Sequence, residues 1–255
     1  MFNRIISGDC RETIKASVVR ILNTEEKRLF YADWHWWFAA RRNLILDCLA
    51  SYPVSGFVLD AGGGGGDIAA AVRRLGHSVV CIDISAKAVK EARSKGLESC
   101  QGDLCALPYQ ENTFDFVLAL DVLEHIEDDM VAIAETRRVL KKDGVLLANV
   151  PAFPCLWGSN DVANGHFRRY KRKELEKKLK SAEFKIIKRF YWNFILFLPA
   201  LLLRRVKILL KISSDDVTVT KTDWLLKILL KADVWIAKRI PLPFGVSEMV
   251  VCQKC

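Results

Sequence analysis

The sequence predicts an α/β fold, a doubly wound and mostly parallel sheet with helices on both faces. Between residues 56 and 150, short apolar runs typical of buried strands alternate with segments of helical period. A run of five glycines separates the first predicted strand from the first helix. In sheets of this kind, a glycine-rich turn at that place lies beside a ligand. Aspartates stand at the ends of the first three predicted strands.

The predicted elements follow in order along the chain. Strands are expected at 56–60, 77–84, 97–103, 114–120 and 144–150, and helices at 67–76, 85–96 and 121–144. Ser85 can cap the second of these helices, and glycines at 76 and 96 can end the first two. After residue 150 the regular alternation stops. There we expect a helix at 171–184, strands at 184–191 and 247–254, and a helical insertion between those strands.

This pattern divides the chain into three parts. We expect a helical N-terminal cap at 1–56, a core formed by 57–193 with 247–255, and an apolar, basic helical insertion at 194–246. The stretch from 190 to 203 carries no charge, but it is shorter than the roughly 20 residues that span a bilayer. Pro199 also interrupts it, so no transmembrane helix is expected.

The chain is basic, with a formal net charge of +9, and the excess of Lys and Arg lies after residue 150. A basic surface suits an anionic membrane, nucleic acid or an acidic substrate. In the insertion, Lys residues alternate with Leu, Ile and Trp. This spacing favours an amphipathic helix on an anionic membrane surface through 190–240, a cap over the active site, or a contact with a second copy. It disfavours nucleic acid, because no stacking platform is formed, and it leaves the oligomeric state open.

The cysteines indicate a reducing environment. The chain has eight of them, and several lie in apolar runs, as Cys81 does, which is typical of buried thiols in the cytoplasm. The first residues lack a long apolar segment with a cleavage site, so no signal peptide is predicted. We expect a cytoplasmic protein, with peripheral membrane contact as an option. Cys252 and Cys255 form one CxxC pair without a second pair of ligands, so no metal site is expected.

The glycine loop admits two ligands. A dinucleotide pattern can be placed on Gly64, Gly66 and Ala69. However, Asp60 and Asp67 flank the loop, and their charges would repel a pyrophosphate at this helix N-terminus. S-adenosylmethionine carries an ammonium group, a ribose diol and no phosphate, so it would be attracted where a dinucleotide is repelled.

Residues after the later strands supply the other parts of such a site. Asp83 can accept both ribose hydroxyl protons, and Asp103 can accept from the adenine amino group with Leu104 against the ring. The predicted cofactor-binding residues are Asp60, Gly62, Gly64, Gly66, Asp83, Ile84, Asp103, Leu104 and Leu120.

The segments "VLDAGGGGG", "CIDIS" and "GDLCALPYQENTFDFVLALDVLEHIED" resemble the motifs of class I S-adenosylmethionine-dependent methyltransferases. The resemblance is to the small-molecule type that includes quinone-biosynthesis enzymes, and it covers about residues 57–150. The later "LWGSNDVANGHFRRYKRKEL" resembles a bacterial and archaeal subgroup. The resemblance implies a seven-stranded sheet with an antiparallel last strand. It also implies that glycine is tolerated at Gly63 and Gly65, where the family usually has a small residue and often Thr.

Methyl transfer is an in-line displacement that depends on positioning and exclusion of water, and an acceptor of high pKa also needs a base. His125 and His166 are the catalytic candidates, although either can instead be a structural side chain. The aromatic stretch "DWHWWFAARR" can form a lid over the sulfonium or simply pack on the core. The substrate-binding candidates are Trp37, Arg41, Trp157, Asp161, Arg168, Arg169 and Tyr170.

Together these features predict a methyltransferase whose acceptor is an oxygen of an apolar, isoprenoid or lipid-linked small molecule. The alternatives are an RNA methyltransferase that uses the basic C-terminal part and a non-catalytic cofactor-binding protein. A dehydrogenase is a weaker alternative.

Overall fold

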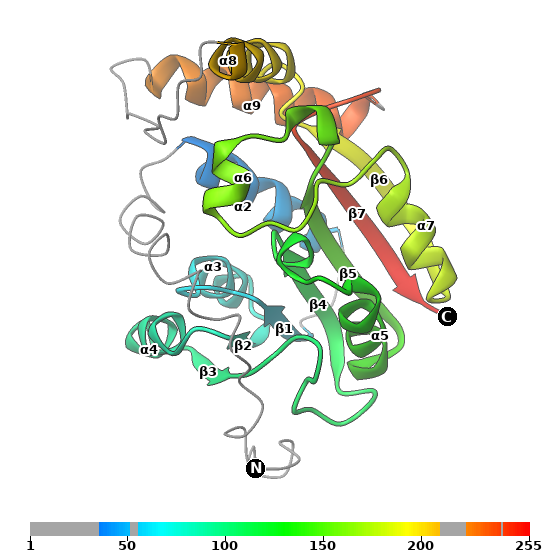
Figure 1. The fold of residues 1–255 in the computed structure, drawn as a ribbon. Coiled ribbons are helices and arrows are strands. Elements are labelled where there is room, and N and C mark those ends of the chain that lie inside the picture. Colours follow the sequence, from blue (N-terminus) through cyan, green and yellow to red (C-terminus); the bar gives the residue numbers. More distant parts are fainter. Residues whose placement is uncertain (1–35, 52–55, 210–222, 241) are drawn as a thin grey trace.

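The computed structural model describes residues 36–51, 56–209, 223–240 and 242–255. Seven strands form one sheet in the order β3-β2-β1-β4-β5-β7-β6 (Figure 1). Neighbours among β1 to β5 pair in parallel, whereas β7 lies antiparallel between β5 and β6. The expected fold class is therefore confirmed. The strands are β1 Phe57–Ala61, β2 Ser78–Asp83, β3 Glu98–Gln101, β4 Phe114–Leu120, β5 Leu140–Pro151, β6 Phe184–Trp192 and β7 Ser247–Lys254.

Helices cover both faces of this sheet. The longer ones are α2 Trp36–Leu49, α3 Asp67–Arg74, α4 Ala86–Ser94, α5 Asp129–Val139, α7 Glu174–Ser181, α8 Phe197–Leu209 and α9 Asp223–Arg239. Short turns are formed by η3 Leu123–His125, η4 Pro154–Leu156 and α6 Ser159–Ala163. In Figure 1, α8 and α9 lie at the top of the view, on the side where α6 lies.

The core consists of two apolar layers, one on each face of the sheet. Successive side chains of a strand point to opposite faces. In β4, Phe116 and Leu118 therefore pack with residues of α2, α3 and α9, whereas Val117 and Ala119 pack with residues of α5 and α7. This arrangement places α2, from the expected cap, and α9, from the expected insertion, on the same face.

The loop after β4 differs from the expectation. A single helix at 121–144 was wrong, because a 3-10 turn, an extended Ile126 and the shorter α5 occupy this stretch, and β5 begins at Leu140. The side chain of Asp128 accepts a hydrogen bond from the Met130 amide and caps α5 there. Glu124 and His125 consequently lie on a separate turn at the carboxyl end of β4.

The division into cap, core and insertion remains a prediction, and residues 1–35 of the cap lie outside the described residues. Helices α8 and α9 fall within the range expected for the insertion. None of the described helices is both long and apolar enough to cross a membrane. Ser85 caps α4 as expected, since its hydroxyl accepts from the Ala88 amide at 3.3 Å.

Candidate active site

The glycine loop is held close to its neighbours by contacts that leave no room for side chains. A Cβ at Gly62 would lie 2.5 Å from Val122, and one at Gly66 would lie 2.4 Å from Leu97. Both glycines have positive φ, 73° and 79°, which disfavours other residues. At Gly64, by contrast, a Cβ would meet no atom of the described residues within 4 Å. Among these residues there is therefore open space next to the loop at Gly64, where a ligand can approach the backbone.

Asp83 connects β2 to this loop. Its carboxylate accepts hydrogen bonds from the amides of Gly64 and Ser85, each at 2.9 Å. Asp83 is half-buried at the carboxyl end of β2, beside the open space at Gly64. This position suits the expected role as the acceptor from a ribose diol.

Asp60 lies beneath the loop and is buried, with 1% of its surface exposed. Its Oδ2 has no hydrogen-bond partner among the described residues and would lie 2.6 Å from a Cβ on Gly63. Burial raises the pKa of Asp60 to about 7, with the charge of Arg41 opposing this rise and that of Asp83 adding to it. A side chain at position 63 would have to shift the Asp60 carboxyl, so the glycine in this chain leaves that carboxyl undisturbed.

The other predicted cofactor residues lie near the ends of β2, β3 and β4. Asp103 follows β3 and accepts from the Cys105 amide at 2.8 Å, which orders the turn that carries Leu104. Leu104 and Leu120 are buried, and Ile84 directly follows β2. Their contacts with a cofactor remain predictions.

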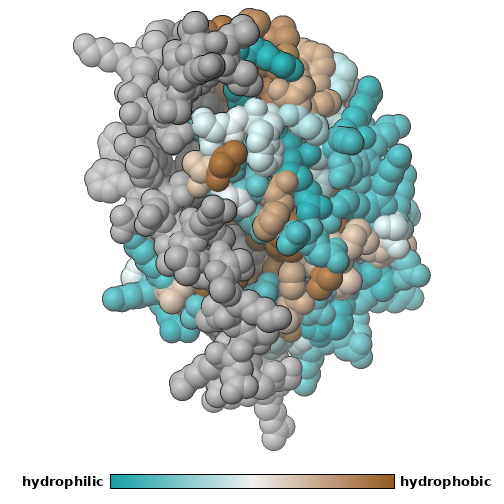
Figure 2. Space-filling view, viewed as in Figure 1, coloured by the Kyte–Doolittle hydropathy of each residue, from teal (hydrophilic) through white to brown (hydrophobic). Residues whose placement is uncertain are grey.

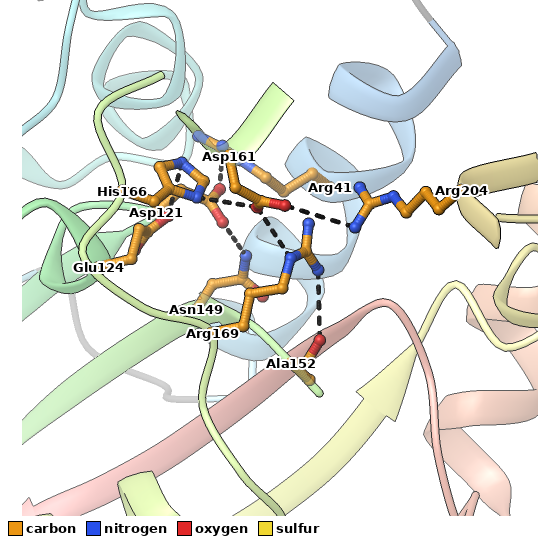
Figure 3. A network of polar contacts seen from close by, with 9 residues as sticks. All are labelled: Arg41, Asp121, Glu124, Asn149, Ala152, Asp161, His166, Arg169 and Arg204. Atoms are coloured by element: carbon orange, nitrogen blue, oxygen red, sulfur yellow. Dashed lines mark hydrogen bonds and ion pairs between the residues drawn. The ribbon is translucent and has the colours of Figure 1, made fainter. Parts of the chain in front are cut away.

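A chain of polar groups runs from Arg41 into the sheet (Figure 3). Asp121, which directly follows β4, has a φ of 55° and forms an ion pair with Arg41. It also accepts from Nδ2 of Asn149 at 2.7 Å, and Asn149 accepts from Nε1 of Trp192 at 2.8 Å. A non-glycine residue with positive φ is held in place by such contacts and is common at functional sites. The sequence analysis missed Asn149 and Trp192, although the lone polar residue in "GVLLANV" was a signal for the former.

Asp161 is the centre of a second network, also drawn in Figure 3. Its buried carboxylate accepts from the Gly158 amide at 2.9 Å and from Nε of Arg169 at 2.8 Å, and it lies 3.1 Å from Nδ1 of His166. Arg204 of α8 approaches it at 3.4 Å. Burial alone would raise the pKa of Asp161, but the bonds from His166 and Arg169 outweigh this effect and lower the pKa to about 2. No sequence signal pointed to Arg204.

The two candidate histidines lie together. The rings of His125 and His166 are perpendicular, with centroids 4.7 Å apart, and Nε2 of His166 lies 4.0 Å from Oε1 of Glu124. Glu124 is buried and was not selected from the sequence. The turn after β4 and the loop after β5 thus bring three titratable side chains to the same edge of the sheet.

The remaining substrate candidates take different positions. Tyr170 is buried, and its hydroxyl donates to Asp129 at 2.7 Å. Arg168 donates to the carbonyls of Ile126 and Glu127. Tyr170, Arg168 and Arg169 therefore hold the loop after α6 in place. Trp157 is half-buried after η4, and the side chain of Trp37 lies outside the described part of the structure.

The sheet order, the reversed last pair of strands and the aspartate beside the glycine loop define a Rossmann-like methyltransferase fold. The comparisons with known proteins agree with this assignment. The sequence model of the methyltransferase domain family matches residues 59–148. This part of the chain is therefore similar to methyltransferase domains, and the curated proteins that match it include one named as S-adenosylmethionine-dependent.

Relatives match this same part of the chain. An enzyme named ubiquinone biosynthesis O-methyltransferase from Xanthomonas oryzae pv. oryzae is 39% identical over 98 residues, which cover 35% of this chain and 40% of that protein. A Mycobacterium tuberculosis protein named "Probable S-adenosylmethionine-dependent methyltransferase" is 30% identical over 119 residues, 46% of this chain and 43% of that one. The matches thus span about two fifths of these curated relatives.

The fold extends over more of the chain than the sequence similarity does. The crystal structure of a SAM-dependent methyltransferase from Archaeoglobus fulgidus superimposes with a TM-score of 0.59 and 14% identity, over 89% of this chain and 99% of that one. At such identity the likeness concerns the fold alone.

Proposed function

We propose that the protein transfers a methyl group from S-adenosylmethionine to an oxygen of an apolar, isoprenoid or lipid-linked small molecule. The observation that supports this most directly is the pairing of Asp83 with the Gly64 amide at 2.9 Å, next to the open space at Gly64. It lies within the segment that matches the methyltransferase domain.

The cofactor would be held at the carboxyl ends of β1, β2 and β3. Asp83 would accept from the ribose hydroxyls, Asp103 would accept from the adenine amino group, and Leu104 would lie against the ring. Asp60 would neutralise the ammonium group from beneath the loop. The bound cofactor supplies a methyl group on a sulfonium, which needs no further activation.

The acceptor would bind where the loops after β4 and β5 meet. His125 and His166 are the catalytic candidates at this place. Asp161 fixes the ring of His166 through Nδ1, so that Nε2 faces Glu124. A fixed imidazole nitrogen is suited to activating a hydroxyl at the reacting end of an acceptor. Positioning of this kind supplies much of the rate acceleration in a displacement reaction.

Two observations support an apolar or lipid-linked acceptor: the exposed apolar residues of α8 and the name of one relative. Leu198, Leu202 and Val206 recur at helical spacing on α8, and all three are exposed, Leu202 to 65%. Apolar colour gathers at the top of Figure 2, where Figure 1 shows α8. The Xanthomonas relative is named for O-methylation in ubiquinone biosynthesis. We propose that this exposed stripe contacts an anionic membrane surface from which the acceptor is drawn.

Calorimetry with S-adenosylmethionine and with NAD tests the cofactor. We expect heat of binding with the former alone. Incubation with labelled cofactor and a lipid extract, or with total RNA, tests the acceptor. Label in an organic-soluble product supports the proposal. Label in RNA would favour the nucleic-acid alternative, and cofactor binding with no transfer to any fraction would favour a non-catalytic protein.

A further inference from the structure

Three side chains that can ligate a metal ion converge at the edge of the sheet. Glu124 and His125 come from η3, and His166 comes from the loop after α6. One ligand atom from each lies within 4.8 Å of the others. His166 lies far along the sequence from Glu124 and His125, and the three residues form no CxxC or HxxxH motif, so no metal is expected here from the sequence.

The orientation of His166 is the second observation. Asp161 accepts from the Gly158 amide and from Arg169 as well as contacting Nδ1 of His166, so it acts as an acceptor and Nδ1 carries the proton. Nε2 then presents a lone pair. This nitrogen has no hydrogen-bond partner among the described residues, although the His166 side chain is only 9% exposed. Such a buried lone pair facing a carboxylate is costly without a proton or a cation between them.

The surroundings of His166 match those of a metal ligand. A ligating histidine almost always donates its other ring N–H to a carboxylate or carbonyl, which fixes the tautomer and raises the basicity of the ligating nitrogen. Asp161 occupies this position, and Arg169 and Arg204 in turn hold Asp161. Two histidines and one carboxylate form a common ligand set for divalent transition metals, with open positions left for water or substrate.

We propose that Glu124, His125 and His166 bind one divalent transition-metal ion, with Asp161 as the carboxylate that orients His166. In a tetrahedral site, metal–nitrogen and metal–oxygen bonds of about 2.1 Å place two ligand atoms about 3.4 Å apart. The ligand atoms, which now lie within 4.8 Å of one another, would therefore have to approach by up to about 1.4 Å on binding the ion. The proposed role of the ion rests on the proposed function and takes the place of proton abstraction by His166, because Nε2 would then hold the ion. The ion would bind the acceptor hydroxyl and lower its pKa, so that its proton passes to water, the oxygen attacks the methyl carbon as an alkoxide or phenolate, and S-adenosylhomocysteine leaves.

Metal binding can be measured without any acceptor. The full-length protein is stripped with a chelator and titrated with Co²⁺ and Mn²⁺ by calorimetry, and bound Co²⁺ is followed by its visible absorption. We expect one ion per chain. His166→Gln and Glu124→Gln should weaken binding at least tenfold, and Asp161→Asn should weaken it by about 10–100-fold while leaving all three ligands in place.

Control variants separate this site from adventitious binding. His77→Gln removes a buried histidine outside the cluster, and Cys255→Ser removes an exposed thiol; neither should change the stoichiometry. Binding that is lost in Cys255→Ser and retained in His166→Gln would overturn the proposal, as would the absence of binding in the wild type.

S-adenosylmethionine affinity is measured on the same samples. Full methyl transfer by metal-free protein would overturn the proposed role of the ion in activating the acceptor and leave the proposed function standing. Metal binding without methyl transfer would overturn the proposed function but not the site.

Discussion

Arg204, on α8, approaches the buried carboxylate of Asp161 at 3.4 Å, and Asp161 is the group that fixes His166. Burial lowers the pKa of Arg204 to about 10; the charge of Arg169 adds to this shift and that of Asp161 opposes it. The side chain of Arg204 thus connects α8, which presents apolar residues to solvent, to the place where the acceptor is proposed to bind. We therefore expect a change in the position of α8 to affect the orientation of His166.

Replacing Arg204 tests this connection. Arg204→Met keeps the apolar stem but removes the charge next to Asp161. We expect kcat to fall about tenfold, equivalent to about 1.4 kcal/mol, with an unchanged Kd for S-adenosylmethionine. Arg205→Met removes an exposed charge from the next position and should have little effect. Equal kcat values in the two variants would contradict the connection.

Replacing Asp83 tests the proposed S-adenosylmethionine site at the carboxyl ends of β1, β2 and β3. Asp83→Ala removes the acceptor for the Gly64 and Ser85 amides and the expected contact with the ribose. We expect calorimetry to detect no binding of S-adenosylmethionine, since the loop loses its anchor and the diol its acceptor. Glu98→Gln, an exposed carboxyl at the start of β3, is the control. Wild-type affinity in Asp83→Ala would remove the basis for the cofactor assignment.

The buried carboxyl of Asp60 predicts a pH-dependent stability. Its pKa is raised from 3.8 to about 7, mainly by burial. The neutral form is therefore favoured in the folded state, and the stability it contributes is full below about pH 4 and is lost as the pH rises towards 7.

Asp60→Asn should remove this dependence. We expect the variant to be more stable than the wild type at pH 8 in the absence of cofactor, by up to about 4 kcal/mol at about 1.4 kcal/mol for each pKa unit, and to bind S-adenosylmethionine more weakly. Urea unfolding at pH 5 and pH 8 measures the first effect. If the difference in stability between variant and wild type is the same at both pH values, the pKa shift is refuted.

Gly66 tests the packing of the loop. Gly66→Ala combines a positive φ with a Cβ placed 2.4 Å from Leu97. We expect a loss of about 2–4 kcal/mol in the free energy of unfolding. Gly76→Ala, at a φ of 93° and with no atom of the described residues within 4 Å of its Cβ, should cost only the backbone strain of about 1 kcal/mol. Similar losses in both variants would mean that Leu97 moves aside at no cost.

The stripe on α8 tests membrane contact. The wild type should sediment with anionic liposomes at low salt and less so at high salt. Leu198→Gln combined with Leu202→Gln should reduce sedimentation several-fold, because it removes exposed apolar area of the stripe that would enter the membrane interface. Leu75→Gln, an exposed leucine at the end of α3, is the matched control. A wild type that stays in the supernatant at low salt would count against the proposal.

The first strands of the sheet, the glycine loop and the aspartates at the strand ends can all be read from the sequence. These are local properties: apolar runs of strand length, glycines between strand and helix, and an acidic residue at or near the carboxyl end of each of the first three strands, where the ends of parallel strands meet at one edge. Asp60 and Asp83 were therefore identified before the structure was known, although the burial of Asp60 was not.

The contacts between side chains that are distant in sequence depend instead on the three-dimensional fold. The crossovers bring Asn149 to Asp121 and Trp192, and the loop after β5 carries His166 to His125 and Glu124. Asp128 caps α5, so this helix begins only at Asp129, and Glu124 lies on the separate turn η3 that precedes it. Hydrogen bonds and ion pairs between side chains tens of residues apart depend on strand order, register and loop path together, and no periodicity within a single segment records them.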